Sequence, residues 1–141
     1  MPDRDLIDAK VESIDRCLKR IADRMPRDAE DLVTDYDAQD ILSLNLQRLV
    51  QLCVDLGAHV ISSRAWRAPS TMAETFTVLS QVNVIDESLA DRMRRAVGFR
   101  NVSVHEYQSI DWNHVYRLVT TRLDDFRIFT QQVIAALDDT R

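Results

Sequence analysis

Apolar residues recur along the chain at alternating steps of three and four, the period of one face of an α-helix. The first such stripe consists of Ile7, Val11, Ile14, Leu18, Ile21 and Met25. Pro26 cannot continue a helix, so the pattern predicts a helix over about residues 3–25. The polar and acidic stretch PRDAEDLVTDYD, residues 26–37, is expected to be a connection.

The same period returns in residues 37–63, in residues 88–104 and in a last segment that begins after Asp111 and runs to about Val133. A short helix is expected over residues 71–81, capped by Ser70 or Thr71. Gly57 lies inside the second helix, where close packing against a neighbouring helix would explain a glycine. With two glycines and three prolines, the chain has few residues for the turns of a sheet. The sequence predicts an all-α fold: a four-helix up-down bundle with one additional short helix, in a single domain over residues 1–141.

Composition is that of a globular protein, with 45% hydrophobic and 29% charged residues. The chain begins MPDRDLID, which lacks the features of a secretory signal, and no apolar run approaches the roughly 20 residues of a membrane helix. A cytoplasmic location without membrane contact is expected. Cys17 and Cys53 fall in apolar segments and are expected to be buried thiols. No Gly-rich phosphate loop and no metal-ligand spacing occurs, so neither a metal nor a cofactor is predicted.

Charge is spread unevenly over the chain. The net charge is −5, and residues 1–40, with twelve acids and seven bases, account for −5. Residues 64–100 carry six arginines against four acids, which gives +2. This small excess is compatible with an ordinary solvated face, and equally with a surface that binds a phosphate backbone.

One polar cluster stands out in the stretch GFRNVSVHEY, residues 98–107. Arg100 is followed after four residues by His105, one of three histidines in the chain, and then by Tyr107. On an ideal helix Arg100 and Tyr107 lie about 20° apart, whereas His105 lies about 140° from Arg100. Either the helix loosens near His105, or a second copy of the chain completes the site.

These residue types suit metal-free cleavage of RNA. Arginine offers a permanently charged fork to phosphate oxygens, and histidine exchanges protons near neutral pH. His105 can promote attack of a ribose 2′-hydroxyl on its own phosphate while Arg100 stabilises the developing charge, and Asn101 can orient either group. Two copies of His105 in a two-fold dimer would supply both a base and an acid. In the structural alternative, Arg100 pairs with Glu106 while His105 and Tyr107 cap or pack a helix end.

The segment FRNVSVHEY resembles the Arg-x4-His-x-Tyr signature of HepT toxins, in the HEPN superfamily of small all-α proteins. The segments LNLQRLVQLCVDLGAHV (44–60) and LDDFRIF (123–129) resemble the second and last helices of that family. The resemblance implies an endoribonuclease toxin of a type II toxin–antitoxin pair, independent of metal. It implies a homodimer with Arg100 and His105 as catalytic residues in a cleft between subunits, supported by Asn101 and Tyr107. It also implies an MNT-type nucleotidyltransferase antitoxin that transfers AMP to Tyr107.

A second polar stripe lies on one side of the helix expected over residues 37–63, and consists of Asn45, Arg48, Asp55 and His59. Its functional interpretation is a wall of the same cleft, formed by Arg48, Asp55 and His59. The alternative interpretation is a hydrogen-bond network that fixes helix register.

Two rival functions remain open. The first is a non-catalytic helical adaptor that binds a nucleotidyltransferase or a nucleic acid through the motif. The second is a nucleotide-binding module whose arginine pocket grips a ligand phosphate. Loss of RNA cleavage in folded variants at Arg100 and His105 would separate the enzyme from both.

Overall fold

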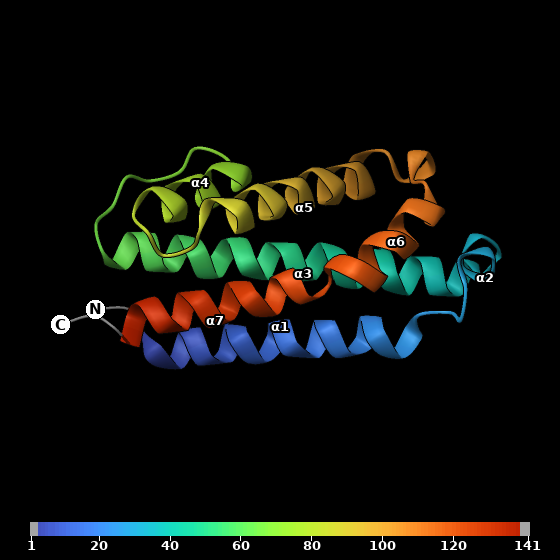
Figure 1. Cartoon of the computed structure of the whole chain (residues 1–141), viewed down its shortest axis with the longest axis horizontal. Coiled ribbons are helices and arrows are strands. Elements are labelled where there is room, and N and C mark those ends of the chain that lie inside the picture. The colour runs from blue at the N-terminus through green and yellow to red at the C-terminus, as the bar shows by residue number, and fades with distance from the viewer. Residues whose placement is uncertain (1–2, 139–141) are drawn as a thin grey trace.

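The computed structural model describes residues 3–138, and these contain seven α-helices, one 3-10 turn and no strand. The elements are α1 (Arg4–Arg24), α2 (Ala29–Thr34), α3 (Tyr36–Ser63), α4 (Met72–Gln81), α5 (Glu87–His105), η1 (Tyr107–Ser109), α6 (Trp112–Arg122) and α7 (Asp124–Asp138). The long helices are antiparallel: α1 and α5 point one way along the bundle, and α3 and the α6–α7 pair point the other way (Figure 1). The predicted all-α four-helix bundle is confirmed, and the one short helix expected in addition, α4, is joined by a second one, α2.

Aspartate side chains set most of the helix starts. The carboxylates of the residues just before α1, α2, α3, α5 and α6 each accept a hydrogen bond from a backbone N–H in the first turn. A cap of this kind stabilises a helix by about 1 kcal/mol. In α4 the cap is Thr71, which accepts from the N–H of Glu74 at 3.1 Å. The acidic connections of the sequence therefore mark where helices begin.

The core forms around α3, which contacts α1, α4, α5 and α7. Phe76 of α4 and Phe129 of α7 meet edge to face there, with ring centroids 5.4 Å apart. Cys17 and Cys53 are buried free thiols, as predicted. At one end of the bundle, Arg4 at the start of α1 forms an ion pair of 2.8 Å with Asp138 at the end of α7.

The connection expected over residues 26–37 contains a helix that the sequence pattern did not predict, the six-residue α2. Asp28 caps α2 by accepting from the N–H of Asp31 at 3.0 Å, and Leu32 is fully buried. One buried residue in six gives no periodic stripe, so the helix has no clear signature in the sequence. Gln39 of α3 fixes it by donating to the carbonyls of Leu32 and Val33.

The last helix is also not continuous: α6 ends at Arg122 and α7 begins at Asp124. Thr120 and Thr121 donate their hydroxyl protons to carbonyls of the preceding turn, at 2.9 Å to Tyr116 and 2.6 Å to Arg117. Threonine bonds of this kind bend helices. The interruption at Leu123 divides the predicted segment without displacing its apolar stripe.

Gly57 is required by close helix packing, as the sequence indicated. A Cβ atom at this position would lie 2.8 Å from Cγ2 of Thr75 and 2.9 Å from Cδ1 of Leu79. We therefore expect Gly57→Ala to lower the free energy of unfolding by about 1–3 kcal/mol through overpacking. Chemical denaturation measures this change in the free energy of unfolding. Gly98→Ala is the control: a Cβ there meets nothing within 4 Å, so helix propensity should make this variant slightly more stable. Equal effects at both positions would contradict the packing argument.

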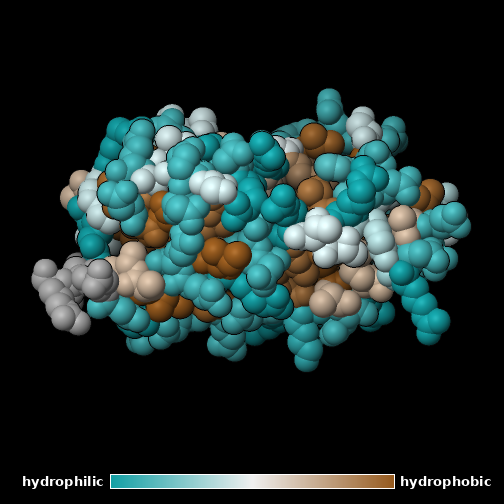
Figure 2. Space-filling model, in the orientation of Figure 1, coloured by the Kyte–Doolittle hydropathy of each residue, from teal (hydrophilic) through white to brown (hydrophobic). Residues whose placement is uncertain are grey.

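On the face seen in Figure 2, apolar side chains are visible in patches between hydrophilic ones. Among residues 3–138, no helix is long and apolar enough to cross a membrane.

Candidate functional site

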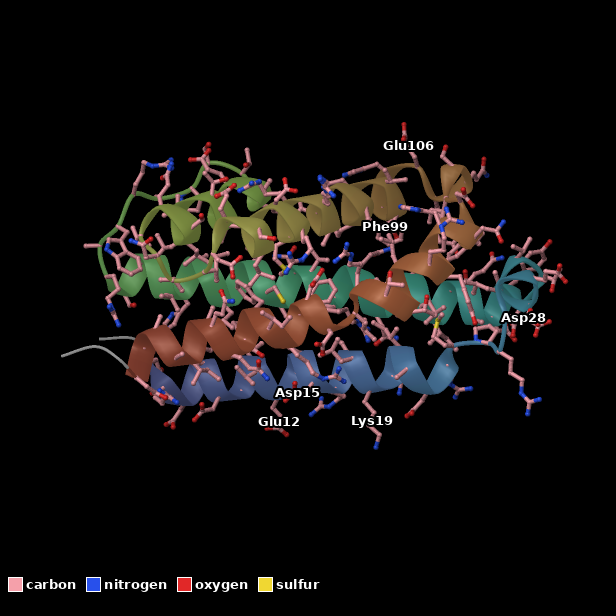
Figure 3. All side chains as sticks on the ribbon, in the orientation of Figure 1. Glu12, Asp15, Lys19, Asp28, Phe99 and Glu106 are labelled. Carbon is pink, nitrogen blue, oxygen red and sulfur yellow. The ribbon has the colours of Figure 1, made fainter. Side chains whose placement is uncertain are left out.

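The site begins where α5 ends. Glu106 leaves helical geometry with φ −139° and ψ 49°, and its N–H donates to the carbonyl of Val102 at 2.8 Å. Its side chain points away from the bundle (Figure 3). Arg100 and His105 therefore both lie in α5, and the helix ends only after His105. Tyr107 lies beyond the helix in η1, so the 3.6-residue period no longer dictates the direction of its side chain.

A buried polar network holds this end of α5 against α3. The hydroxyls of Ser103 and Ser43 are 2.6 Å apart, and Gln47 donates its amide to Ser103 at 2.7 Å. Both serines are 2% exposed. Because buried polar groups are costly unless they are hydrogen-bonded, these pairs specify the position of α5 along α3.

Tyr107 is fixed by two neighbours. Its hydroxyl donates to a carboxylate oxygen of Asp40 on α3 at 2.6 Å, and its ring meets Trp112 edge to face with centroids 5.8 Å apart. Burial, together with the hydrogen bond and negative charge of Asp40, raises the pKa of Tyr107 to about 12. The phenol is thus held neutral, pointing at a group that can accept its proton.

Removing the Asp40 charge should lower the pKa of Tyr107 from about 12 towards its ordinary value of 10. We expect Asp40→Asn to show this shift in the ultraviolet absorbance of tyrosinate, with Tyr107→Phe assigning the signal. Because the unfolded chain releases this proton first, the free energy of unfolding of the wild type falls as pH rises from about 10 to about 12. The fall should be smaller in Asp40→Asn. Asp37→Asn, an exposed charge removed from the same helix, is the control; a shift of equal size there would contradict the contact.

The remaining motif residues have few partners. Nη1 of Arg100 donates to the amide oxygen of Asn101 at 3.2 Å, and its buried Nε has no acceptor in the described part of the chain. Among residues 3–138, Arg100 forms no ion pair, so the sequence-based alternative of a pair with Glu106 is not observed. His105 is exposed, and no hydrogen bond joins it to Arg100 within the described chain. Within the described chain, the Arg100 guanidinium has no carboxylate partner and the His105 imidazole has no hydrogen bond, so both side chains can contact a ligand.

The second polar stripe lies elsewhere on α3. Asn45 and Arg48 line a cavity against α1, Asp55 accepts from Gln51 at 2.9 Å, and Nε2 of His59 accepts the N–H of Asp3 at 3.1 Å. By contrast, the residues of α3 that hold the motif are Asp40, Ser43 and Gln47. Within one chain Arg48, Asp55 and His59 therefore contact α1 and their own helix. Their role as a cleft wall stays a prediction.

Sequence reasoning missed Asp40, the residue that fixes the Tyr107 hydroxyl. It lies 67 positions away from Tyr107, and no spacing along the chain links the two. In the described part of the chain, no three His, Cys, Asp or Glu side chains gather in a way that could hold a metal ion.

Comparison with known proteins reveals several relatives. The chain is 34% identical over 131 residues to the mRNA nuclease HepT of Shewanella oneidensis, covering 93% of this chain and 98% of that protein. It is 26% identical over 128 residues to the tRNA nuclease HepT of Aphanizomenon flos-aquae, covering 91% and 87%. The fold matches the tri-AMPylated Shewanella oneidensis HEPN toxin in complex with MNT antitoxin, with a TM-score of 0.88 at 34% identity over 93% of this chain and 98% of that one.

A weaker likeness concerns the fold alone. The cytosolic protein YutE of Bacillus subtilis, at 18% identity, matches with a TM-score of 0.83 over 97% of this chain and 92% of its own. The model of the family described as ribonuclease HepT-like matches residues 14–133, a range that includes the whole Arg100–Tyr107 motif and the helices that hold it. The chain belongs to the ribonuclease HepT-like family.

Proposed function

We propose that this protein is a metal-independent endoribonuclease, the toxin of a toxin–antitoxin pair, with Arg100 and His105 as catalytic residues. The observation that carries the proposal is the exposed His105 at the end of α5, five residues beyond Arg100, whose guanidinium forms no ion pair within residues 3–138. Two similar proteins are a messenger RNA nuclease and a transfer RNA nuclease. The supporting residues are Asn101 and Tyr107.

The chemistry follows from the properties of the two side chains. Neutral His105 takes the proton of a ribose 2′-hydroxyl, and the oxygen attacks the adjacent phosphorus. Arg100 stabilises the negative charge that builds on the phosphate oxygens, with Asn101 holding its guanidinium at 3.2 Å. The bond from phosphorus to the 5′-oxygen breaks, and a protonated imidazole gives that oxygen its proton. The products are a 2′,3′-cyclic phosphate end and a 5′-hydroxyl end.

A homodimer completes this mechanism. One chain offers a single His105, about 7.5 Å along α5 and about 140° around it from Arg100 on ideal helix geometry. A second copy facing it supplies the other proton-transfer group and places an imidazole opposite each guanidinium. An active protein that stays monomeric in sedimentation measurements would contradict the shared site.

The antitoxin is an MNT-type nucleotidyltransferase that transfers AMP to Tyr107. A similar toxin, from Shewanella oneidensis, is tri-AMPylated and in complex with MNT antitoxin. The Tyr107 hydroxyl attacks the α-phosphorus of ATP, pyrophosphate leaves, and Asp40 accepts the phenol proton across their 2.6 Å hydrogen bond. The added phosphate brings negative charge and bulk beside Arg100, where the RNA phosphate would bind.

The experiment is RNA cleavage by the protein purified without a partner, in the presence of EDTA. Intact mass is measured first, because AMP on Tyr107 would hide the activity. Cleavage that persists in EDTA supports the proposal. Absence of cleavage by the unmodified, folded dimer on several RNAs would favour the rival function, an adaptor that only binds a nucleotidyltransferase or RNA through the motif.

A further inference from the structure

A cavity of about 370 Å³ lies between α1 and α3, outside the motif. Its lining includes Arg16 and Arg20 from α1 and Arg48 and Asn45 from α3. None of its lining residues is acidic, whereas the chain as a whole has a net charge of −5. A hollow with three positive charges attracts an anion.

The three arginines line one cavity, and none of them forms a close ion pair within residues 3–138. Burial raises the pKa of the Cys17 thiol at this cavity, and the positive charges of Arg48, Arg16 and Arg20 all oppose that rise. Arg16 reaches Glu12 only at 3.8 Å, in a pair whose side chains are mostly exposed. Arg20 and Arg48 form no ion pair within residues 3–138. Their guanidinium donors are therefore available to phosphate oxygens, which they suit in geometry.

Besides a negative charge to match the arginines, a ligand in this cavity would need a hydrogen-bond donor, because of Asn45. The residue is 2% exposed, and its side-chain amide donates to the carbonyl of Ile41 at 2.8 Å. Its amide oxygen is buried and has no hydrogen-bond partner among residues 3–138. An unmet buried acceptor costs about 1–3 kcal/mol, and a donor from a ligand bound at this site would offset that cost. An inert hydrogen-bond network, the structural interpretation of this stripe, would have satisfied that oxygen.

A ribose-phosphate unit of RNA meets both requirements. Its phosphate accepts from the arginines, and its 2′-hydroxyl donates to the oxygen of Asn45. The cavity also lies within reach of a strand bound at the motif. Arg48 is eight residues, or about 12 Å along the axis of α3, beyond Asp40, which contacts the motif residue Tyr107. At about 3.4 Å per nucleotide of a stacked strand, three or four nucleotides span that distance.

We propose that the cavity between α1 and α3 is a second RNA-binding subsite, which holds a phosphate and the 2′-hydroxyl of the substrate strand a few nucleotides from the motif. The inference rests on the proposed ribonuclease function and adds the residues that grip the strand away from the cleavage point. Arg48 is the residue whose side chain joins the cavity to the exposed face of α3.

The test measures the Kd of a fluorescent single-stranded RNA in the His105→Ala background, where cleavage cannot interfere. We expect Arg48→Gln to raise Kd about 10-fold and to reduce the slope of log K against log salt by about 0.7, the loss of one phosphate contact. The matched control is Lys19→Gln, which removes one charge from α1 at a side chain that points away from the bundle (Figure 3). Its effect should stay below about twofold.

The hydroxyl contact has its own test. The wild type should bind this RNA more tightly than DNA of the same sequence, and Asn45→Leu, which keeps the branched shape of the side chain but has no amide oxygen, should reduce that preference. Equal affinities of Arg48→Gln and Lys19→Gln for RNA would overturn the subsite. So would a change of oligomeric state in Arg48→Gln without a change in RNA affinity, because the cavity would then belong to a contact between copies.

Failure of this inference and failure of the proposed function give different results. If the protein is no ribonuclease, the wild type leaves RNA intact whatever the affinities of the Arg48 variants. If only the subsite is wrong, cleavage remains and Arg48→Gln binds as the control does.

Discussion

His105→Ala should cleave RNA at least about 100-fold more slowly than the wild type, since a positioned acid or base contributes about 10²–10⁴ to a rate. The imidazole is exposed at the last residue of α5 and makes no hydrogen bond within the described chain, so its removal should leave the fold intact. Initial rates on one RNA in EDTA measure the loss. The circular dichroism and thermal midpoint of the variant should match those of the wild type.

The control for this variant is His114→Ala. His114 is also exposed, but it lies in the first turn of α6, where its backbone N–H is held by Asp111 at 3.3 Å. Its loss should leave cleavage unchanged. Equal activity in His105→Ala and the wild type would remove His105 from the mechanism. Arg100→Ala should lose about 10²–10³ in rate, the usual size of a lost electrostatic contact to a transition state.

Tyr107→Phe should abolish the transfer of AMP by the cognate antitoxin. The substitution keeps the ring that packs edge to face on Trp112 and removes the hydroxyl that donates to Asp40. Intact mass after incubation with antitoxin and ATP measures the adduct. The wild type should gain mass in steps of one adenylyl group, and this modified form should lose RNA cleavage.

Tyr36→Phe is the matched control, because Tyr36 is 74% exposed at the start of α3. It should be modified as fast as the wild type. Asp40→Asn should slow the transfer without abolishing it, since the amide keeps a hydrogen-bond acceptor but cannot take the proton. Full modification of Tyr107→Phe would place the AMP acceptor elsewhere in the chain.

Long, regular elements were predictable from the sequence because their apolar stripes extend over several turns. The pattern predicts a helix over residues 37–63, and α3 spans Tyr36–Ser63. The pattern does not predict α2, because only Leu32 is buried among its six residues. The interruption at Leu123 was missed for the opposite reason: the apolar stripe continues across it from Val119 to Phe126, and only the threonine bonds mark the bend.

In the candidate site, too, the residues that are close in sequence were predictable and those brought together by helix packing were not. Arg100, His105 and Tyr107 lie within eight consecutive positions, so a pattern can detect them. Asp40 reaches Tyr107 only because Ser43 and Gln47 fix α3 against Ser103 of α5, and such pairing across helices leaves no trace in one sequence. Likewise, the sequence does not show that Arg16 and Arg20 line one cavity with Arg48, because only the packing of α1 on α3 brings them together.

The most direct test of the central claim is the chemistry of the RNA ends left after cleavage by the partner-free protein in EDTA. Attack by the 2′-hydroxyl predicts 2′,3′-cyclic phosphate and 5′-hydroxyl ends, identified by mass spectrometry of a short RNA. An RNA with a single 2′-deoxy residue at the cleavage site should stay intact there. Fragments with 3′-hydroxyl and 5′-phosphate ends, or activity that disappears with EDTA, would contradict a metal-free site built on His105 and Arg100.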